Sequence, residues 1–205
     1  MIVYVETNFV LELALLQTEH QDCSTLLEMA TAGEIALAIP AFSLSEPYGT
    51  LIARGKRRKD IRDSLHNVLE ELSRSEPYGE RPRTAQPVRD TLNNSAAEER
   101  QRLDAAVGRI AAVATILPLD GDTFQAALAL LTIRDIPPQD ALVYSAISQH
   151  MQANQHESKC FITTNIKDFA NPDTLAELAA NNCRLLPRFN HGVGYIRSRA
   201  NRTES

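Results

Sequence analysis

The chain has 205 residues, enough for one domain with an elaboration. Its hydrophobic content of 43% can supply a real core, whereas its few aromatic residues (5%, with no Trp) argue against a base-stacking surface for single-stranded nucleic acid. The formal net charge of −5 at pH 7 excludes a uniformly basic nucleic-acid coat, although metal ions can still let an acidic protein bind phosphate.

Cysteine usage and the N-terminal residues indicate the compartment. Cys23, Cys160 and Cys183 are widely spaced and odd in number, which favours buried thiols in a reducing cytosol over a disulfide framework or a zinc site. The N-terminal apolar run has no basic segment before it and is far too short to span a bilayer. We therefore expect a soluble cytoplasmic protein with no membrane partner.

The first part of the chain alternates between strand-like and helical patterns. The continuous apolar run of residues 2–5 is typical of a strand buried on both faces of a parallel sheet. Asn8 can cap a helix directly after that strand, and Gly33 is a typical helix stop. The elements expected here are a strand over 2–5, helices over 8–16 and 22–32, a strand over 35–39, and a helix capped by Ser43 or Ser45 with Glu46 and Pro47 in its first turn.

Residues from about 73 to 99 differ from the rest because they contain three prolines, many charged residues and little apolar periodicity. We interpret them as an inserted excursion, part loop and part helix, outside the main sheet. The elements expected after it are helices over 96–112, 122–133, 139–151 and 173–180, with strands over 115–119, 160–163 and 184–187. Residues 190–205 are expected to form a flexible basic tail. This alternation predicts one domain over 1–189 with a parallel α/β sandwich.

Four acidic residues, Glu6, Glu46, Asp140 and Asp168, stand where a strand has just ended or a helix begins. Because ligands of open α/β sheets bind at the carboxyl ends of the strands, we expect these carboxylates to meet at one edge. Gathered carboxylates repel one another, and Mg²⁺ or Mn²⁺ offsets that repulsion through oxygen ligands. Such a site can activate water and stabilise a phosphodiester displacement.

Each acid also has a purely structural interpretation. Glu6 can cap the helix that it precedes, Glu46 and Asp140 can be acids in the first turn of a helix, and Asp168 can cap the turn before Pro172. The smaller polar residues nearby are cap and turn residues by default, or hydrogen-bond partners that orient the carboxylates. They are Asn8, Thr163 and Asn165.

The most basic stretch of the chain follows Glu46 on the expected helix. For any single residue we favour the interpretation of a solvated helix end. As a group, these residues can contact RNA phosphates. Its basic residues are Arg54, Lys56, Arg57, Arg58 and Lys59.

Taken together, these segments resemble the PIN-domain nucleases, and in particular the VapC-type toxins of toxin–antitoxin pairs. Residues 5–8 (Val-Glu-Thr-Asn) resemble the first motif, with Glu6 where the family usually has Asp. Residues 40–46 resemble the second motif, 140–147 the third and 163–169 the fourth, with Asn165 at a position that is Asp or Asn in the family. The excursion has no counterpart in minimal members.

The resemblance implies a three-layer α/β/α sandwich with a central, mostly parallel sheet of about five strands. It implies an Mg²⁺- or Mn²⁺-dependent endoribonuclease in which Glu6, Glu46, Asp140 and Asp168 bind metal, assisted by Asn8, Thr163 and Asn165. Its partners would be RNA, a second copy in a homodimer, and an antitoxin protein. Two alternatives remain open: a catalytically impaired PIN-fold module that binds RNA or protein, and a metal-dependent phosphatase on a similar sheet.

Overall fold

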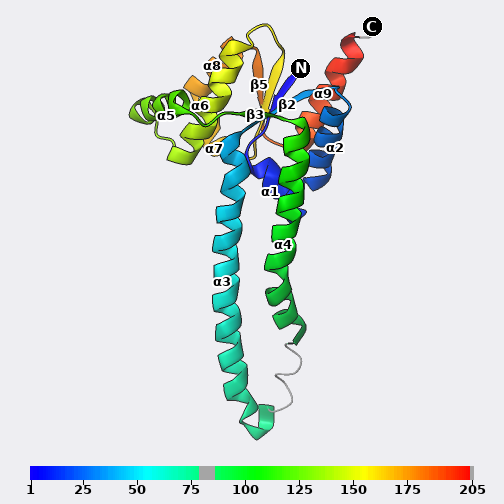
Figure 1. Cartoon of the computed structure of the whole chain (residues 1–205), viewed down its shortest axis with the longest axis vertical. Helices are drawn as coiled ribbons and strands as arrows, with labels where there is room; N and C mark the ends of the chain where they lie inside the picture. Colours follow the sequence, from blue (N-terminus) through cyan, green and yellow to red (C-terminus); the bar gives the residue numbers. More distant parts are fainter. Residues whose placement is uncertain (79–85, 204–205) are drawn as a thin grey trace.

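The computed structural model describes residues 1–78 and 86–203, with a five-stranded parallel sheet at its centre (Figure 1). The sheet order is β3-β2-β1-β4-β5, and every neighbouring pair is parallel. Its strands are β1 (Ile2–Tyr4), β2 (Ala36–Pro40), β3 (Thr115–Leu117), β4 (Lys159–Ile162) and β5 (Cys183–Leu186). The predicted strands are all present, and the expected α/β sandwich is confirmed.

The strand order reverses direction at β1. The chain proceeds from β1 outward through β2 to β3, and then returns to place β4 on the other side of β1. Val3 pairs in register with Leu37 of β2 and with Cys160 of β4. The carboxyl ends of β1 and β4 therefore form a topological switch point, where open α/β sheets usually bind ligands.

Helices cover both faces of the sheet, because alternate strand residues point to opposite sides. Val3 and Val5 belong to one core, whereas Ile2 and Tyr4 belong to the other. The first core is completed by α1 (Thr7–Leu15), α2 (His20–Thr31), α9 (Phe189–Thr203) and the inner ends of α3 (Ala41–Ser73) and α4 (Gln86–Val113). The second is completed by α5 (Gly121–Ile133), α6 (Pro138–Ala153), α7 (Ile166–Phe169) and α8 (Pro172–Ala180).

Two helix starts differ from the sequence prediction. Glu6 rather than Asn8 is the N-cap of α1, since its carboxylate accepts a hydrogen bond from the Asn8 backbone N–H. Helix α3 starts at Ala41, directly after β2, with Pro40 as its N-cap and no capping side chain. Glu46 consequently lies in the second turn of α3.

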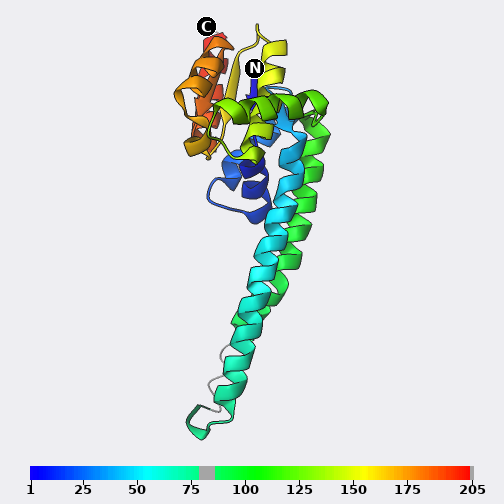
Figure 2. The same ribbon diagram turned by 90° about the vertical axis from the view of Figure 1, so that its left-hand side faces the viewer.

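The excursion is a helical arm. Helices α3 and α4 run side by side far beyond the rest of the molecule, which both views show (Figures 1 and 2). Arg58 of α3 forms a bidentate ion pair with Glu99 of α4, at 2.7 and 2.8 Å. The sequence prediction for residues 73–99 thus underestimates the helical content, because α3 extends to Ser73 and α4 already begins at Gln86. Residues 79–85 of that prediction lie outside the described part.

The expectation of a flexible tail does not hold for α9, which starts at Phe189 and packs on the sheet (Figure 1). Phe189, Val193 and Ile196 are buried in the first core, and their spacing of four and three residues places them on one face of the helix. Gly192 lies against Ile162 of β4, where a Cβ atom would come within 2.3 Å of its Cδ1. This close approach explains a glycine inside the helix.

The remaining expectations concern cysteines and membranes. Cys23, Cys160 and Cys183 are buried free thiols, as predicted. Within the described residues no helix is both long and apolar enough to cross a bilayer.

Candidate metal centre

The four sequence-predicted acids come from four segments at the carboxyl-end edge of the sheet. Glu6 follows β1, Glu46 lies on α3 after β2, Asp140 is in the first turn of α6, and Asp168 is on α7 after β4. Asp140 is the hub, since its carboxylate feels the negative charges of Asp168 and Glu46 and in turn acts on Glu6. The structure therefore places Asp140 within electrostatic range of each of the other three acids.

Glu6 is the most deeply buried acid of the set, with 5% of its surface exposed. One carboxylate oxygen accepts from the Asn8 backbone N–H at 2.9 Å, and the other accepts from the Thr163 hydroxyl at 2.9 Å. The second bond crosses from β1 to β4 at the switch point. Burial raises the pKa of the Glu6 carboxyl to about 7, although the bonds from Asn8 and Thr163 lower it.

Asp140 is half-buried at the start of α6. Burial raises its pKa to about 6, and the neighbouring charges of Asp168 and Glu46 act in the same direction. The side-chain amide of Asn165 donates to one Asp140 oxygen at 3.3 Å and lowers the pKa. The Asn165 backbone N–H in turn donates to the Thr163 hydroxyl at 2.9 Å. The two predicted orienting residues of the fourth motif thus connect Glu6 with Asp140.

Glu46 is held by a residue that the sequence reasoning did not select. Thr7 is buried and lies between Glu6 and Asn8 in the sequence, and its hydroxyl donates a hydrogen bond to a Glu46 carboxylate oxygen. The run of polar residues Glu6-Thr7-Asn8 could have pointed to Thr7. Consecutive polar residues directly after a buried strand all lie at the same sheet edge. Thr7 therefore links the first motif to the second.

The predicted basic stretch divides into two kinds of residue. Lys56, Arg57 and Lys59 are exposed on α3, and Arg54 is half-buried. Arg58 instead serves the arm, because both of its terminal nitrogens bind the Glu99 carboxylate. Among the described residues, no Lys, Arg or His forms an ion pair with any of the four acids.

The chemistry of the site fits a hard divalent cation. The donors are carboxylate oxygens with hydroxyl and amide neighbours, which Mg²⁺ and Mn²⁺ prefer, and the described protein supplies no cation to balance them. The fit is one of composition rather than of finished geometry. In the described part, no three His, Cys, Asp or Glu side chains already stand close enough to hold a metal ion together.

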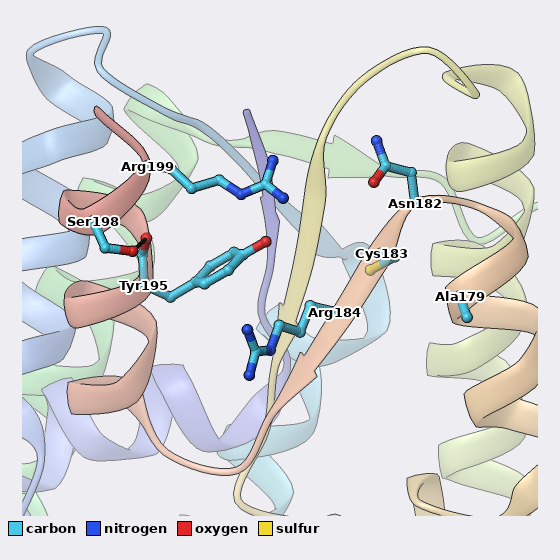
Figure 3. Close-up of a pocket in the computed structure, with 7 residues that line it drawn as sticks. All are labelled: Ala179, Asn182, Cys183, Arg184, Tyr195, Ser198 and Arg199. Carbon is cyan, nitrogen blue, oxygen red and sulfur yellow. Dashed lines mark hydrogen bonds between the residues drawn. The ribbon is translucent and has the colours of Figure 1, made fainter. Parts of the chain in front are cut away.

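A cavity of about 400 Å³ near the opposite end of β5 contains none of these acids (Figure 3). It lies between β5 and α9, and the guanidinium groups of Arg184 and Arg199 lie 5.2 and 5.3 Å from the Tyr195 ring centroid. Arg199 also donates to the Ser158 hydroxyl at 2.7 Å. The Arg184–Tyr195 cation–π contact and the Arg199–Ser158 hydrogen bond attach α9 to the sheet edge, whereas the Arg199–Tyr195 contact lies within α9.

Comparison with known proteins agrees with this architecture. A family model described as PIN domain matches residues 3–169, which include all four acids and the whole arm. No match to the chain was found among curated proteins or among solved structures. PIN domains are typically nucleases that use divalent metals. The parallel sheet, the acids at its switch point and the family match together show that the chain belongs to the PIN-domain family.

Proposed function

We propose that this protein is an Mg²⁺- or Mn²⁺-dependent endoribonuclease that hydrolyses RNA phosphodiesters. The observation that supports this most strongly is the cluster of Glu6, Glu46, Asp140 and Asp168 at the switch point without a protein cation among the described residues. A divalent ion bound there supplies a Lewis acid for water and phosphate. The resemblance of the four motifs to PIN nucleases supports the same conclusion.

The side chains have distinct tasks in this proposal. Asp140, Glu46 and Asp168 are half-buried, so their oxygens can reach a cation from the solvent side. Thr7 fixes one Glu46 oxygen, and Asn165 fixes one Asp140 oxygen, so each acid keeps its other oxygen for the ion. This positioning reduces the reorganisation that binding requires.

Glu6 contributes charge from beneath these three acids. Both of its oxygens already accept protein hydrogen bonds, but a carboxylate oxygen has a second lone pair. Its additional methylene, compared with the usual Asp, brings the carboxylate to Thr163, directly after the neighbouring strand β4. Glu6 therefore orients the first motif against the fourth as well as adding negative charge.

The basic face of α3 is the proposed contact for the RNA backbone. Lys56 lies ten residues after Glu46 on the same helix, about 15 Å along the axis. Lys56 and Lys59 are exposed and have no ion-pair partner in the described structure. The affinity for RNA should consequently fall as salt concentration rises, and this salt dependence should be smaller in Lys56→Glu.

The test is cleavage of a mixed, end-labelled RNA pool with and without Mn²⁺. Asp140→Asn should abolish divalent-dependent cleavage, because it removes the charge at the centre of the cluster. Asp122→Asn is the matched control, since Asp122 is an exposed acid in the first turn of α5. Equal cleavage by wild type and Asp140→Asn would contradict the proposal.

One observation favours a second candidate function, a catalytically impaired PIN-fold module that binds RNA or protein. Glu6 replaces the usual Asp and is turned inward as a helix cap. This candidate predicts that wild type binds RNA without cleaving it and that Glu6→Asp gains cleavage. The nuclease proposal instead predicts a loss in Glu6→Asp, since the shorter side chain gives up the Thr163 contact.

The resemblance to VapC-type toxins also leads us to propose an inhibitory antitoxin protein as a partner. A short neighbouring reading frame that encodes a DNA-binding protein would support it. Co-expression should then suppress the RNA cleavage and any growth arrest caused by this chain alone.

A further inference from the structure

The helical arm lacks a core of its own. None of the described residues between 52 and 102 is buried, whereas Leu51 and Leu103 at its base are. Both views show α3 and α4 extending from the body with no other element beside them (Figures 1 and 2). Helices obtain most of their stability from packing an apolar face, so a long two-helix arm of this kind is expected to pack against a further surface.

An apolar stripe on α3 is the part of the arm left uncovered. Ile61, Val68 and Leu72 are 49%, 51% and 38% exposed, and their spacing of seven and four residues places them on one face of the helix. The face toward α4 is a different one, as the ion pair of Arg58 with Glu99 defines. Leu65, half-buried, lies between the stripe and that face. This spacing is typical of a helix that packs lengthwise against another helix.

Charge is strongly segregated along the same helix. The part nearest the body is basic, and the part toward the tip is mainly acidic. The basic part contains Arg54, Lys56, Arg57, Arg58, Lys59 and Arg62 against Asp60, and the tip part of the helix contains Asp63, Glu70 and Glu71. Two copies of α3 packed in opposite directions would place each basic part against the other's acidic part, whereas parallel packing would place like charges together.

The sequence also contains the symmetry that such a pair requires. Arg57, Ser64 and Glu71 are spaced by seven residues and follow one edge of the stripe. All three are exposed, and neither Arg57 nor Glu71 has an ion-pair or hydrogen-bond partner for its side chain in the described structure. With a two-fold axis beside Ser64, Arg57 aligns with the partner's Glu71 twice, and Ile61 lies one residue out of register from the partner's Val68 twice, within side-chain reach at about 1.5 Å per residue.

The length of the arm is compatible with this arrangement. Ser73, the last residue of α3, lies nine residues beyond Ser64, so it would align with the partner's Gly55. Leu51, where the buried body begins, lies four residues farther on. The two α3 helices can therefore pair over residues 55–73, at about 1.5 Å per residue, before the end of either helix reaches the partner's Leu51.

We infer that the exposed face of α3 is a self-association surface, on which a second copy of this chain packs antiparallel to form a symmetric four-helix bundle of two arms. The small Ser64 at the axis allows close approach of the helices. The inference is independent of nuclease activity, because it uses no residue of the acid cluster.

The test is the monomer–dimer equilibrium of the full chain, measured by sedimentation over a range of protein concentrations. Arg57→Glu and Glu71→Arg should each raise the dimer dissociation constant about tenfold or more, because each creates two repulsive contacts. The double variant Arg57→Glu/Glu71→Arg should restore it to within about threefold of wild type. Arg109→Glu, the same charge change at an exposed position of α4 next to the body, should leave dimerisation unchanged.

A cross-link tests the register separately. A short bis-maleimide should join two copies of Ser64→Cys, whereas wild type, with buried Cys23, Cys160 and Cys183, should remain uncross-linked. A monomeric wild type at all concentrations would overturn the inference, as would a double variant no better than its single parents. Dimers that cross-link through Lys56→Cys but not through Ser64→Cys would overturn the antiparallel register.

Discussion

Replacing Glu6 by Gln should stabilise the metal-free protein at neutral and alkaline pH. The folded protein raises the pKa of Glu6 from 4.5 to about 7, so it binds this proton more tightly than the unfolded chain does. The stabilisation from that proton is complete below pH 4.5 and is lost as pH rises through 7. Above pH 7 the buried charge therefore costs about 3 kcal/mol, an upper figure because the surroundings relax.

Gln can take the place of the carboxylate without losing its contacts. Its carbonyl oxygen can accept from the Asn8 backbone N–H, and its amide can donate to the Thr163 hydroxyl. The expected gain of about 1–3 kcal/mol at pH 8 corresponds to about 2–10 °C in the midpoint of thermal unfolding for a chain of this size. At pH 4.5 the two proteins should unfold at nearly the same temperature.

The assay is thermal unfolding followed by circular dichroism in EDTA, in steps from pH 4.5 to 8.5. Glu34→Gln is the matched control, since Glu34 is exposed and lies far from the cluster in the chain. The difference between Glu6→Gln and wild type should grow with pH, whereas the control difference should stay flat. A Glu6→Gln protein that is less stable by the same amount at every pH would refute the reasoning.

Three further variants test contacts elsewhere in the molecule. Thr163→Val removes a donor to Glu6 and the acceptor of a backbone N–H, so it should lower the free energy of unfolding by about 1–3 kcal/mol in chemical denaturation and raise the pKa of Glu6 further. Arg58→Met should speed hydrogen exchange in α4 without affecting α6, because it leaves Glu99 unpaired. Lys159→Met should lower the free energy of unfolding by about 3 kcal/mol, because the buried ammonium donates to three backbone carbonyls that would lose their partner. Chemical denaturation measures this loss.

Much of the fold could be predicted because local patterns decide it. The strand over 2–5 is apolar at every position, and the same alternation of short strands with amphipathic helices recurs to residue 186. The candidate site was predictable for the same reason, since parallel strands deliver their carboxyl ends to one edge. Glu6 after β1 and Asp168 after β4 needed only that rule to be placed at that edge, whereas Asp140 opens α6 after another helix.

The rest depends on contacts between distant segments. The sequence of the arm suggests a polar excursion because none of its described residues between 52 and 102 is buried in a core. The ion pair that joins its two helices connects positions 41 residues apart. The sequence of the tail suggests disorder because Phe189, Val193 and Ile196 are separated mainly by polar residues and Gly. Only their packing against the sheet explains the helix. The role of Thr7 required knowing where Glu46 would lie.

The central claim is that the acids around Asp140 form a divalent-cation site, and calorimetric titration with Mn²⁺ tests it most directly. Because burial and neighbouring charges raise the pKa of Glu6 to about 7 and that of Asp140 to about 6, binding at pH 6 should release protons, which buffers of different ionisation enthalpy reveal. At pH 8 the release should vanish. Asp140→Asn should abolish binding and Asp122→Asn should preserve it. Absence of Mn²⁺ binding by wild type, or equal binding by Asp140→Asn, would contradict the claim.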